Sequence, residues 1–484
     1  MFKAIRKYYH QKSTKTQAAI QFGLAVLISI LIISYQLSSQ SVTPPHSDAL
    51  AYLNIALDIH DTGTFTDGDF NGVANKAGPN DEGMFFSPLY PFFLSLIMKF
   101  DTDFYQMSTC LTENISLDKI CDVHIGGLII AQGIIAIVSL LLVWTSALIV
   151  TGKKSIAWVS MIFASLAECY SYYAALALNE NLVFPLFTLF CLLLVLGFKK
   201  RKWQIIFLAG IVLGLTALTR PSFPYVAYTS CFIAILLAAW IMLRGLKNYN
   251  TPALLMIFFM GYVVSVTPWI IRNGITLGEY AISSGYAPFI LVQRAAYNEM
   301  TGKEFAASFV YGLPDFGDTL AKKLFHEENY KRFRYSEPSG FYRQGNGEFK
   351  ENAIREAGGD ENLLKYLLET SIFGNAIKHI LVTFSLVWSG MWVSKYWGLI
   401  TIPIFLAVLG KSIYNKNYNL LIYALPAWFM LGFNAFTSVN VVRYNLILIP
   451  CLAIAAGTFV IFAFDAFKKK NADLKPKRCS NVNV

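Results

Sequence analysis

The chain has 484 residues, of which 55% are hydrophobic and only 14% are charged, and its formal net charge at pH 7 is +10. Ordinary soluble domains carry about 25% charged residues, so this composition excludes a water-soluble protein and predicts one that crosses a membrane many times. The positive charge lies mainly in clusters beside apolar runs, which is a topology signal and requires no nucleic-acid partner.

The first apolar run covers residues 18–35 and follows a basic segment that holds Lys3, Arg6, Lys7, Lys12 and Lys15. The run lacks the small-residue pattern at which signal peptides are cleaved. We therefore expect a retained membrane helix with the N-terminus in the cytoplasm.

A polar loop at residues 37–83 follows this helix on the opposite side of the membrane. Residues 48–60 have the apolar spacing of a helix that lies along the membrane surface, and residues 66–83 form a Gly, Asp and Asn-rich tip. Asp48 starts the helix. It either caps the helix N-terminus, as Ser47 would also do, or supplies a carboxylate for chemistry at the membrane surface.

The next apolar segment, residues 84–100, contains Pro88 and Pro91. As a helix it would reach only about 24 Å against a hydrocarbon core of about 30 Å. We expect an interfacial or re-entrant helix here, and likewise for residues 376–393.

Seven cysteines occur without CxxC spacing, which argues against a disulfide scaffold and a zinc site. Cys110 and Cys121 are the two that fall in a polar loop between apolar runs. Whether they form a disulfide stays open at this point, because it depends on the loop facing an oxidising compartment.

The long apolar runs predict ten spans, and the short loops place both termini and most basic clusters in the cytoplasm of a multi-pass protein of the cell inner membrane. If the two shorter segments also crossed, there would be twelve spans and the cluster at 199–202 would lie outside. The ten predicted spans cover residues 18–35, 125–150, 155–178, 180–198, 203–219, 222–243, 252–271, 397–410, 419–436 and 444–466.

We divide the chain into a membrane module at 1–272, a long extracytoplasmic loop at 273–375, a second membrane module at 376–466 and a basic tail at 467–484. The long loop is aromatic and exceeds the length of a mere connection, so it suits a lid or an acceptor-binding element. We find no internal repeat, which counts against most secondary transporters.

Three arginines, Arg220, Arg272 and Arg443, fall at the extracytoplasmic ends of spans, against the positive-inside bias. Each alone is explained by a side chain that reaches lipid headgroups. Three at one face are better explained by an anionic ligand, and the guanidinium group suits phosphate.

Glu180 lies at the start of a span on the same side as Asp48. It is either a carboxylate favoured by the helix dipole or a member of the same site. The tripeptide Asp67-Gly68-Asp69 looks like the metal motif of nucleotide-sugar transferases, but it lies in an outside loop that is Gly-rich for turn formation.

Several ordered landmarks together carry a family resemblance. The landmarks are Asp48 with Tyr52 and Gly63, Ser87 to Pro91, Asn179-Glu180, Leu215 to Pro221, Pro268-Trp269 with Arg272-Asn273, and Arg443-Tyr444 followed by Pro450. In their order and spacing the chain resembles the GT-C glycosyltransferases over residues 18–465, closest to the branch of protein O-mannosyltransferases and lipid A aminoarabinose transferases.

The resemblance implies an all-α bundle of about 10 to 12 transmembrane helices that transfers a sugar from a polyprenyl-phosphate carrier to a glycan, lipid or protein acceptor outside the cytoplasm. Asp48 matches the acidic residue regarded as catalytic, and Glu180 matches an acidic position of the same cavity. The family often has a second acid beside the first. Ala49 takes its place here, which puts a metal site within this loop in doubt.

The residues fit this chemistry independently. Asp48 is suited to take a proton from an acceptor hydroxyl, and positioned arginines stabilise the leaving phosphate, with Arg443 and Arg272 as the expected pair. Direct displacement would invert the anomeric configuration. The alternative is a transporter or flippase of an anionic lipid or lipid-linked sugar, and the sugar, the acceptor and metal dependence stay open. The predicted site comprises Asp48 and Glu180 as catalytic residues, Arg220, Arg272, Arg443 and Tyr444 around the donor phosphate, and Tyr52, Tyr90 and Asn273 in the substrate cavity.

Overall fold

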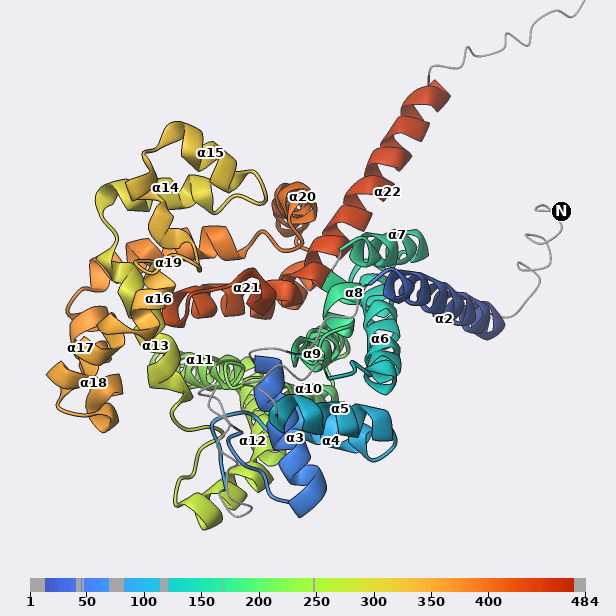
Figure 1. The fold of residues 1–484 in the computed structure, drawn as a ribbon. Coiled ribbons are helices and arrows are strands. Elements are labelled where there is room, and N and C mark those ends of the chain that lie inside the picture. Colours follow the sequence, from blue (N-terminus) through green and yellow to red (C-terminus); the bar gives the residue numbers. More distant parts are fainter. Residues whose placement is uncertain are drawn as a thin grey trace, which may run out of the picture.

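The structure is a computed structural model that describes residues 14–40, 45, 48–68, 82–113, 121–167, 169–246 and 249–473. Every regular element within these ranges is a helix (Figure 1), and several of the long helices are apolar. The predicted all-α polytopic membrane fold is confirmed.

Within the described ranges, eight helical segments are long and apolar enough to cross a membrane. Long apolar helices satisfy their own backbone hydrogen bonds, which is the condition for lying in lipid. The eight are α2 (Thr14–Ser38), α6 (Gly126–Thr151), α9 (Glu180–Lys200), α11 (Pro224–Leu243), α12 (Asn250–Leu277), α20 (Tyr396–Tyr414), α21 (Asn419–Thr437), and η6 (Val442–Leu448) continued by α22 (Ile449–Asp473).

Two of the ten expected spans are shorter than predicted. The run at 155–178 forms α7 (Lys154–Ser165) and the short α8 (Cys169–Ala174), and the run at 203–219 forms α10 (Trp203–Ala217) of 15 residues. At 1.5 Å per residue, α10 reaches only about 22 Å, and Pro221 lies just beyond its end.

Helix α10 nevertheless returns the chain to the end where α9 begins. Glu180, the first residue of α9, lies 3.7 Å from Arg220, which follows α10. The basic turn at 199–202 therefore lies at the far end of an α9–α10 hairpin. The side of α10 away from this hairpin packs closely on α12, because Gly210 and Gly261 leave room for the facing backbone.

The segments at 84–100 and 376–393 form α4 (Leu89–Met98) and α19 (Ala376–Gly390). The helical segments 360–373 and 376–390 meet at an angle of 89°, which is the geometry of a broken span or a re-entrant segment. A ninth crossing among the described residues would require this bent pair to act as one span.

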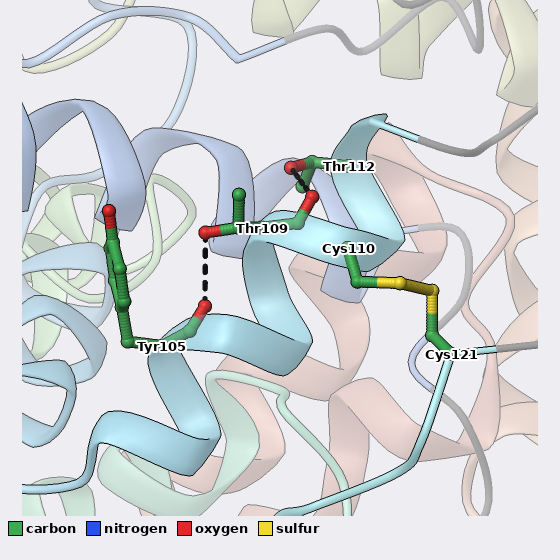
Figure 2. The surroundings of a disulfide bond; sticks show 5 residues. All are labelled: Tyr105, Thr109, Cys110, Thr112 and Cys121. Carbon is green, nitrogen blue, oxygen red and sulfur yellow. Dashed lines mark hydrogen bonds between the residues drawn. A yellow bond between two sulfur atoms is a disulfide. The ribbon is translucent and has the colours of Figure 1, made fainter.

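The first polar loop contributes α3 (Asp48–Thr62), whose apolar face buries Leu53, Ile55 and Ala56. This helix packs on α4 and on α5 (Thr102–Glu113). A disulfide joins Cys110 of α5 to Cys121, just before α6 (Figure 2).

The long loop begins after Leu277 and is folded into short helices, which lie on the side of the molecule away from α2 and α6 (Figure 1). Leu291, Val292, Leu363 and Leu367 form a small core of its own. The helices are α13 (Tyr286–Ala296), η1 (Tyr297–Glu299), α14 (Gly302–Tyr311), α15 (Gly317–Leu324), η2 (Glu327–Asn329), η3 (Lys331–Phe333), α16 (Phe341–Asn346), α17 (Glu348–Ala357), η4 (Asp360–Asn362), α18 (Leu363–Leu367) and η5 (Leu368–Phe373).

A fully buried arginine fixes this loop to the membrane helices. Arg294 of α13 donates to the carbonyl of Ala435 in α21 at 2.8 Å and to that of His379 in α19 at 2.9 Å. A third bond, also 2.9 Å long, reaches the Asn298 side chain. Because a buried guanidinium must have its donors paired, these bonds hold α13 at one position over the bundle.

Candidate active site

A cavity of about 450 Å³ lies where α3 and α9 begin, where α10 ends and where η6 lies. Its charged side chains are Asp48, Glu180, Arg220 and Arg443. All four were predicted from the sequence to share one face, and the structure brings them together from segments as far apart as residues 48 and 443.

Local structure explains why each of these side chains projects from an element end. Asp48 and Glu180 are the first residues of α3 and α9, where a carboxylate faces the positive end of the helix dipole. Arg220 lies in the turn between α10 and α11, and Arg443 lies in the 3-10 helix before α22. The four charged side chains of the cavity are thus provided by the starts of helices and by the connections between them.

The four charged groups form an alternating chain. Arg443 donates through Nη2 to Asp48 Oδ2, and its Nε lies 3.6 Å from Glu180 Oε1. Arg220 Nη1 lies 3.7 Å from the same Glu180 oxygen. With all four ionised, two positive and two negative charges balance, which is how a cavity at a membrane boundary can hold them.

Burial divides this chain into two parts. The side chains of Glu180 and Arg220 are only 5% and 9% exposed, whereas those of Asp48 and Arg443 are 34% and 30% exposed. Glu180 Oε2 has no hydrogen-bond partner among the described residues, and a cavity of about 20 Å³ adjoins Glu180. Glu180 therefore contacts the two guanidinium groups from the buried side of the cavity, and Asp48 lies on its more exposed side.

The ring of Tyr444 contacts the guanidinium groups of both Arg220 and Arg443. The Arg220 guanidinium carbon lies 3.8 Å from the centre of the Tyr444 ring, and that of Arg443 lies 5.4 Å away. Both distances are within the range of cation–π attraction. The aromatic face stabilises positive charge without neutralising it, so the guanidinium groups stay available to an anion.

Tyr52 lines the cavity and is held by Asn179, whose Nδ2 donates to Tyr52 Oη at 2.8 Å and to the Thr219 carbonyl at 3.1 Å. Burial, with further contributions from Asp48 and Glu180, raises the pKa of Tyr52 well above its ordinary value. Tyr52 is therefore a neutral phenol at physiological pH.

Tyr90, expected in the substrate cavity, does not line it. Its ring lies behind Tyr52 with 5.2 Å between ring centres, and its hydroxyl donates to Gln132 Oε1 at 3.2 Å. The tyrosine supports the cavity wall and does not face the cavity itself.

Arg272 and Asn273 also lie away from the cavity. Arg272 pairs with Glu82 at 2.6 Å and donates to the carbonyls of Gly83 at 2.7 Å and Phe65 at 3.1 Å. Asn273 donates to the Ala281 carbonyl at 2.8 Å. The expected pair of Arg443 with Arg272 is therefore not assembled, and Arg220 takes the place beside Arg443. Arg272 instead joins the two ends of the loop tip at 66–83, because it contacts Phe65 on one side and Glu82 and Gly83 on the other.

The long loop supplies one wall of the cavity. Tyr335 and Tyr342 line the cavity, in keeping with the aromatic character of this loop, and so do Tyr286, Phe289 and Gln293. The last three follow Gly285, whose positive φ of 74° opens α13. A glycine directly before a helical run with aromatic residues is the sequence feature that could have indicated these three cavity residues.

The donor set at the cavity does not suit a metal ion. Among the described residues no three His, Cys, Asp or Glu side chains gather in a potential metal site. Asp48 and Glu180 are the carboxylates of the cavity, and the Arg443 guanidinium lies between them. A cation between these carboxylates would have to displace that guanidinium.

A second cavity of about 340 Å³ meets the first at the ion pair. Asp48, Arg443 and Tyr342 line both cavities, whereas Glu180 and Arg220 line only the first of the two. The remaining wall of the second cavity includes Ile125 and Leu128 at the start of α6. The Asp48–Arg443 pair thus stands between two chambers of different chemistry.

Comparisons with known proteins give structural matches only. A search of protein-family models and a search of curated proteins found no match. Among solved structures, the chain is similar to ArnT from Cupriavidus metallidurans bound to undecaprenyl phosphate, with a TM-score of 0.46, 12% identity and coverage of 92% of this chain and 60% of that one.

It is also similar to the archaeal oligosaccharyltransferase AglB from Archaeoglobus fulgidus in complex with an inhibitory peptide and a dolichol-phosphate. That match has a TM-score of 0.45 and 12% identity, and covers 96% of this chain and 52% of the other. The match to the apo form of the Archaeoglobus fulgidus oligosaccharyltransferase has a TM-score of 0.47 and 11% identity. It covers 95% of this chain and 52% of the other. The chain spans between half and three fifths of the length of these structures.

Proposed function

We propose that this protein is a membrane glycosyltransferase that moves a sugar from a polyprenyl-phosphate carrier to an acceptor hydroxyl on the extracytoplasmic face. The observation that carries the proposal is the Asp48–Arg443 pair, which sets a carboxylate beside one guanidinium group in a cavity that a second, that of Arg220, also lines. A transfer of this kind needs one group to accept a proton and others to stabilise a leaving phosphate. The ordered sequence motifs support the same class.

Arg220 and Arg443 are the proposed phosphate-binding residues. A phosphate in the first cavity meets two guanidinium groups, each of which offers donors in a planar fork. Because Arg443 is paired with Asp48 in the free protein, an incoming phosphate competes with that carboxylate. Donor binding therefore draws Arg443 toward the phosphate and frees Asp48.

Asp48 is the proposed general base. It lines both cavities, so an acceptor in the second cavity can approach it from the side opposite Arg220. The carboxylate takes the hydroxyl proton as the acceptor oxygen bonds to the anomeric carbon. The bond between that carbon and the phosphate oxygen breaks, and its electron pair leaves with polyprenyl phosphate. A single displacement of this kind inverts the anomeric configuration.

The carrier explains why the site lies at the end of a helix bundle. A polyprenyl chain is dissolved in the bilayer, so the sugar-phosphate head must be reached from the membrane boundary. The first cavity, which we assign to the phosphate, lies where α3 and α9 begin.

The test uses the full chain in nanodiscs with a radiolabelled polyprenyl-phosphate sugar and measures release of polyprenyl phosphate. We expect Asp48→Asn to slow transfer by about 100- to 10,000-fold. Asp58→Asn is the matched control, because Asp58 belongs to the same helix and is absent from the linings of both cavities. Undiminished transfer by Asp48→Asn overturns the general-base assignment, and movement of intact carrier across the bilayer without cleavage identifies a flippase.

A further inference from the structure

A separate cavity of about 160 Å³ lies at the end of the bundle opposite the Asp48 site. It is enclosed by the end of α6, the start of α7, the end of α20, the start of α21 and the middle of α22. Its apolar floor is buried, and its rim carries Lys153 and Lys411. The rim belongs to the end that the basic clusters place in the cytoplasm.

The two lysines converge on one aromatic ring. Lys153 Nζ lies 4.7 Å from the centre of the Phe462 ring, and Lys411 Nζ lies 5.2 Å from the same centre. Both ammonium groups thus lie beside one ring at the rim of the same cavity. The nearest carboxylate, Asp465, is 3.9 Å from Lys153, and both side chains of that pair are about half exposed, at 46% and 58%. Such a pair compensates little charge.

Lys411 has no carboxylate within 4.0 Å in the described part of the chain. Its place in the last turn of α20 is favourable to a cation, and a single lysine there needs no ligand. The helix dipole does not explain why a second lysine, from the α6–α7 turn, faces the same ring. An anion in this cavity would meet both ammonium groups, since Lys153 and Lys411 both line it.

Neutral hydrogen-bonding groups surround the lysines. Hydroxyl and amide side chains line the cavity, and α7 begins beside it without a side-chain cap, whereas the first N–H of α21 donates to Asn417 Oδ1 at 3.3 Å. Uncapped helix starts add donors for an anion. The polar lining residues are Thr151, Ser412, Asn415, Asn417 and Thr458.

We propose that this cavity binds the phosphate of an anionic phospholipid headgroup from the cytoplasmic leaflet. The ligand chemistry is a phosphate that carries a net negative charge, held by Lys153 and Lys411 and surrounded by neutral donors. The lipid source follows from the location, because the site opens where apolar helices end and the buried side chains Ile156, Val408 and Leu420 form its floor. This site is independent of the sugar-transfer proposal.

Thermal unfolding of the purified full chain in detergent tests the site, with phosphatidylglycerol, phosphatidylcholine and glycerol 3-phosphate as separate additives. We expect phosphatidylglycerol to raise Tm and phosphatidylcholine to have little effect. The double variant Lys153→Gln/Lys411→Gln should need about thirtyfold more phosphatidylglycerol for the same shift, because each lysine near such a surface contributes about 1 kcal/mol. Lys153→Arg/Lys411→Arg should retain most of the effect.

Lys200→Gln/Lys202→Gln is the matched control, because it removes the same charge from the connection between α9 and α10, whose lysines do not line this cavity. An equal loss of response in this control would show a general surface-charge effect and overturn the proposal. Equal protection by glycerol 3-phosphate would assign the cavity to a soluble phosphate and overturn its assignment to lipid. If the glutamine double variant does not fold, Ser412→Leu, which fills the cavity, must weaken the lipid response.

Discussion

Arg443 donates a hydrogen bond to Asp48, a residue 395 positions earlier in the chain, and closes an ion pair at the boundary of two cavities. The Asp48 carboxylate is thus already bonded to a guanidinium group, for which an incoming anion would have to compete. The pair therefore couples the proposed binding of phosphate to the release of the proposed base.

Replacing Arg443 or Arg220 with glutamine should weaken the donor complex. Each change removes a cation that we assign to the phosphate, so the KM for donor should rise about tenfold or more, with a lower kcat. Steady-state kinetics with varied polyprenyl-phosphate sugar measure both quantities.

Arg272→Gln provides the contrast. Arg272 lies outside the cavity and binds Glu82 and two loop carbonyls. Its loss should therefore lower the free energy of unfolding by about 1 to 3 kcal/mol. The donor KM of the folded fraction should stay near the wild-type value. A donor KM that rises as much as in Arg443→Gln would place Arg272 back at the phosphate.

Glu180→Gln should lower the stability of the protein and strengthen its binding of phosphate. The buried carboxylate lies 3.6 Å from Arg443 and 3.7 Å from Arg220, so its loss leaves two guanidinium groups without their shared anion. We expect a fall in unfolding free energy of about 3 to 5 kcal/mol, together with tighter binding of polyprenyl phosphate. Denaturation in detergent and equilibrium binding of polyprenyl phosphate measure the two effects.

Glu304→Gln is a suitable control for that variant. Glu304 is also buried and lies 3.4 Å from Arg332, but it belongs to the capping box of α14, outside the cavity. This change should lower stability and leave phosphate binding unaltered. Weaker phosphate binding in Glu180→Gln would show that Glu180 orients the arginines more than it competes with the ligand.

Tyr52→Phe should change how stability depends on alkaline pH. Because burial raises the pKa of Tyr52, the folded state retains the phenolic proton at pH values where the unfolded chain, with a pKa of about 10, has lost it. The favourable contribution is therefore complete below about pH 10 and decreases as the pH rises further. Wild-type Tm should fall more steeply above that pH than the Tm of Tyr52→Phe.

Tyr280→Phe, at a position 72% exposed, should reproduce the wild-type profile. Parallel alkaline profiles for wild type and Tyr52→Phe would mean that Tyr52 titrates alike in both states.

The Cys110–Cys121 disulfide should be found by peptide mapping under non-reducing conditions. It closes a short loop with a sequence separation of 11, so Cys110→Ser/Cys121→Ser should lower stability by about 2 to 3 kcal/mol. Alkylation of both thiols in intact cells would show instead that this loop is reduced and would contradict its extracytoplasmic placement.

The helical membrane fold could be predicted because each long apolar run is local in the sequence. Hydropathy over such a window determines which segments prefer lipid, and basic clusters determine how they are oriented. The predicted count of ten exceeds the eight long apolar helical segments among the described residues, because α10 and the broken α7–α8 segment are short. Hydropathy alone does not report such breaks.

That Asp48, Glu180, Arg220 and Arg443 lie at one face could be predicted from the sequence, because apolar runs place each of them. Folding in three dimensions sets Arg220, rather than Arg272, beside the site of Arg443 and puts Tyr90 behind the cavity wall. The end of an apolar helix fixes how deep in the membrane a residue beside it lies. Which neighbours meet at that depth depends on side-chain packing between segments hundreds of residues apart.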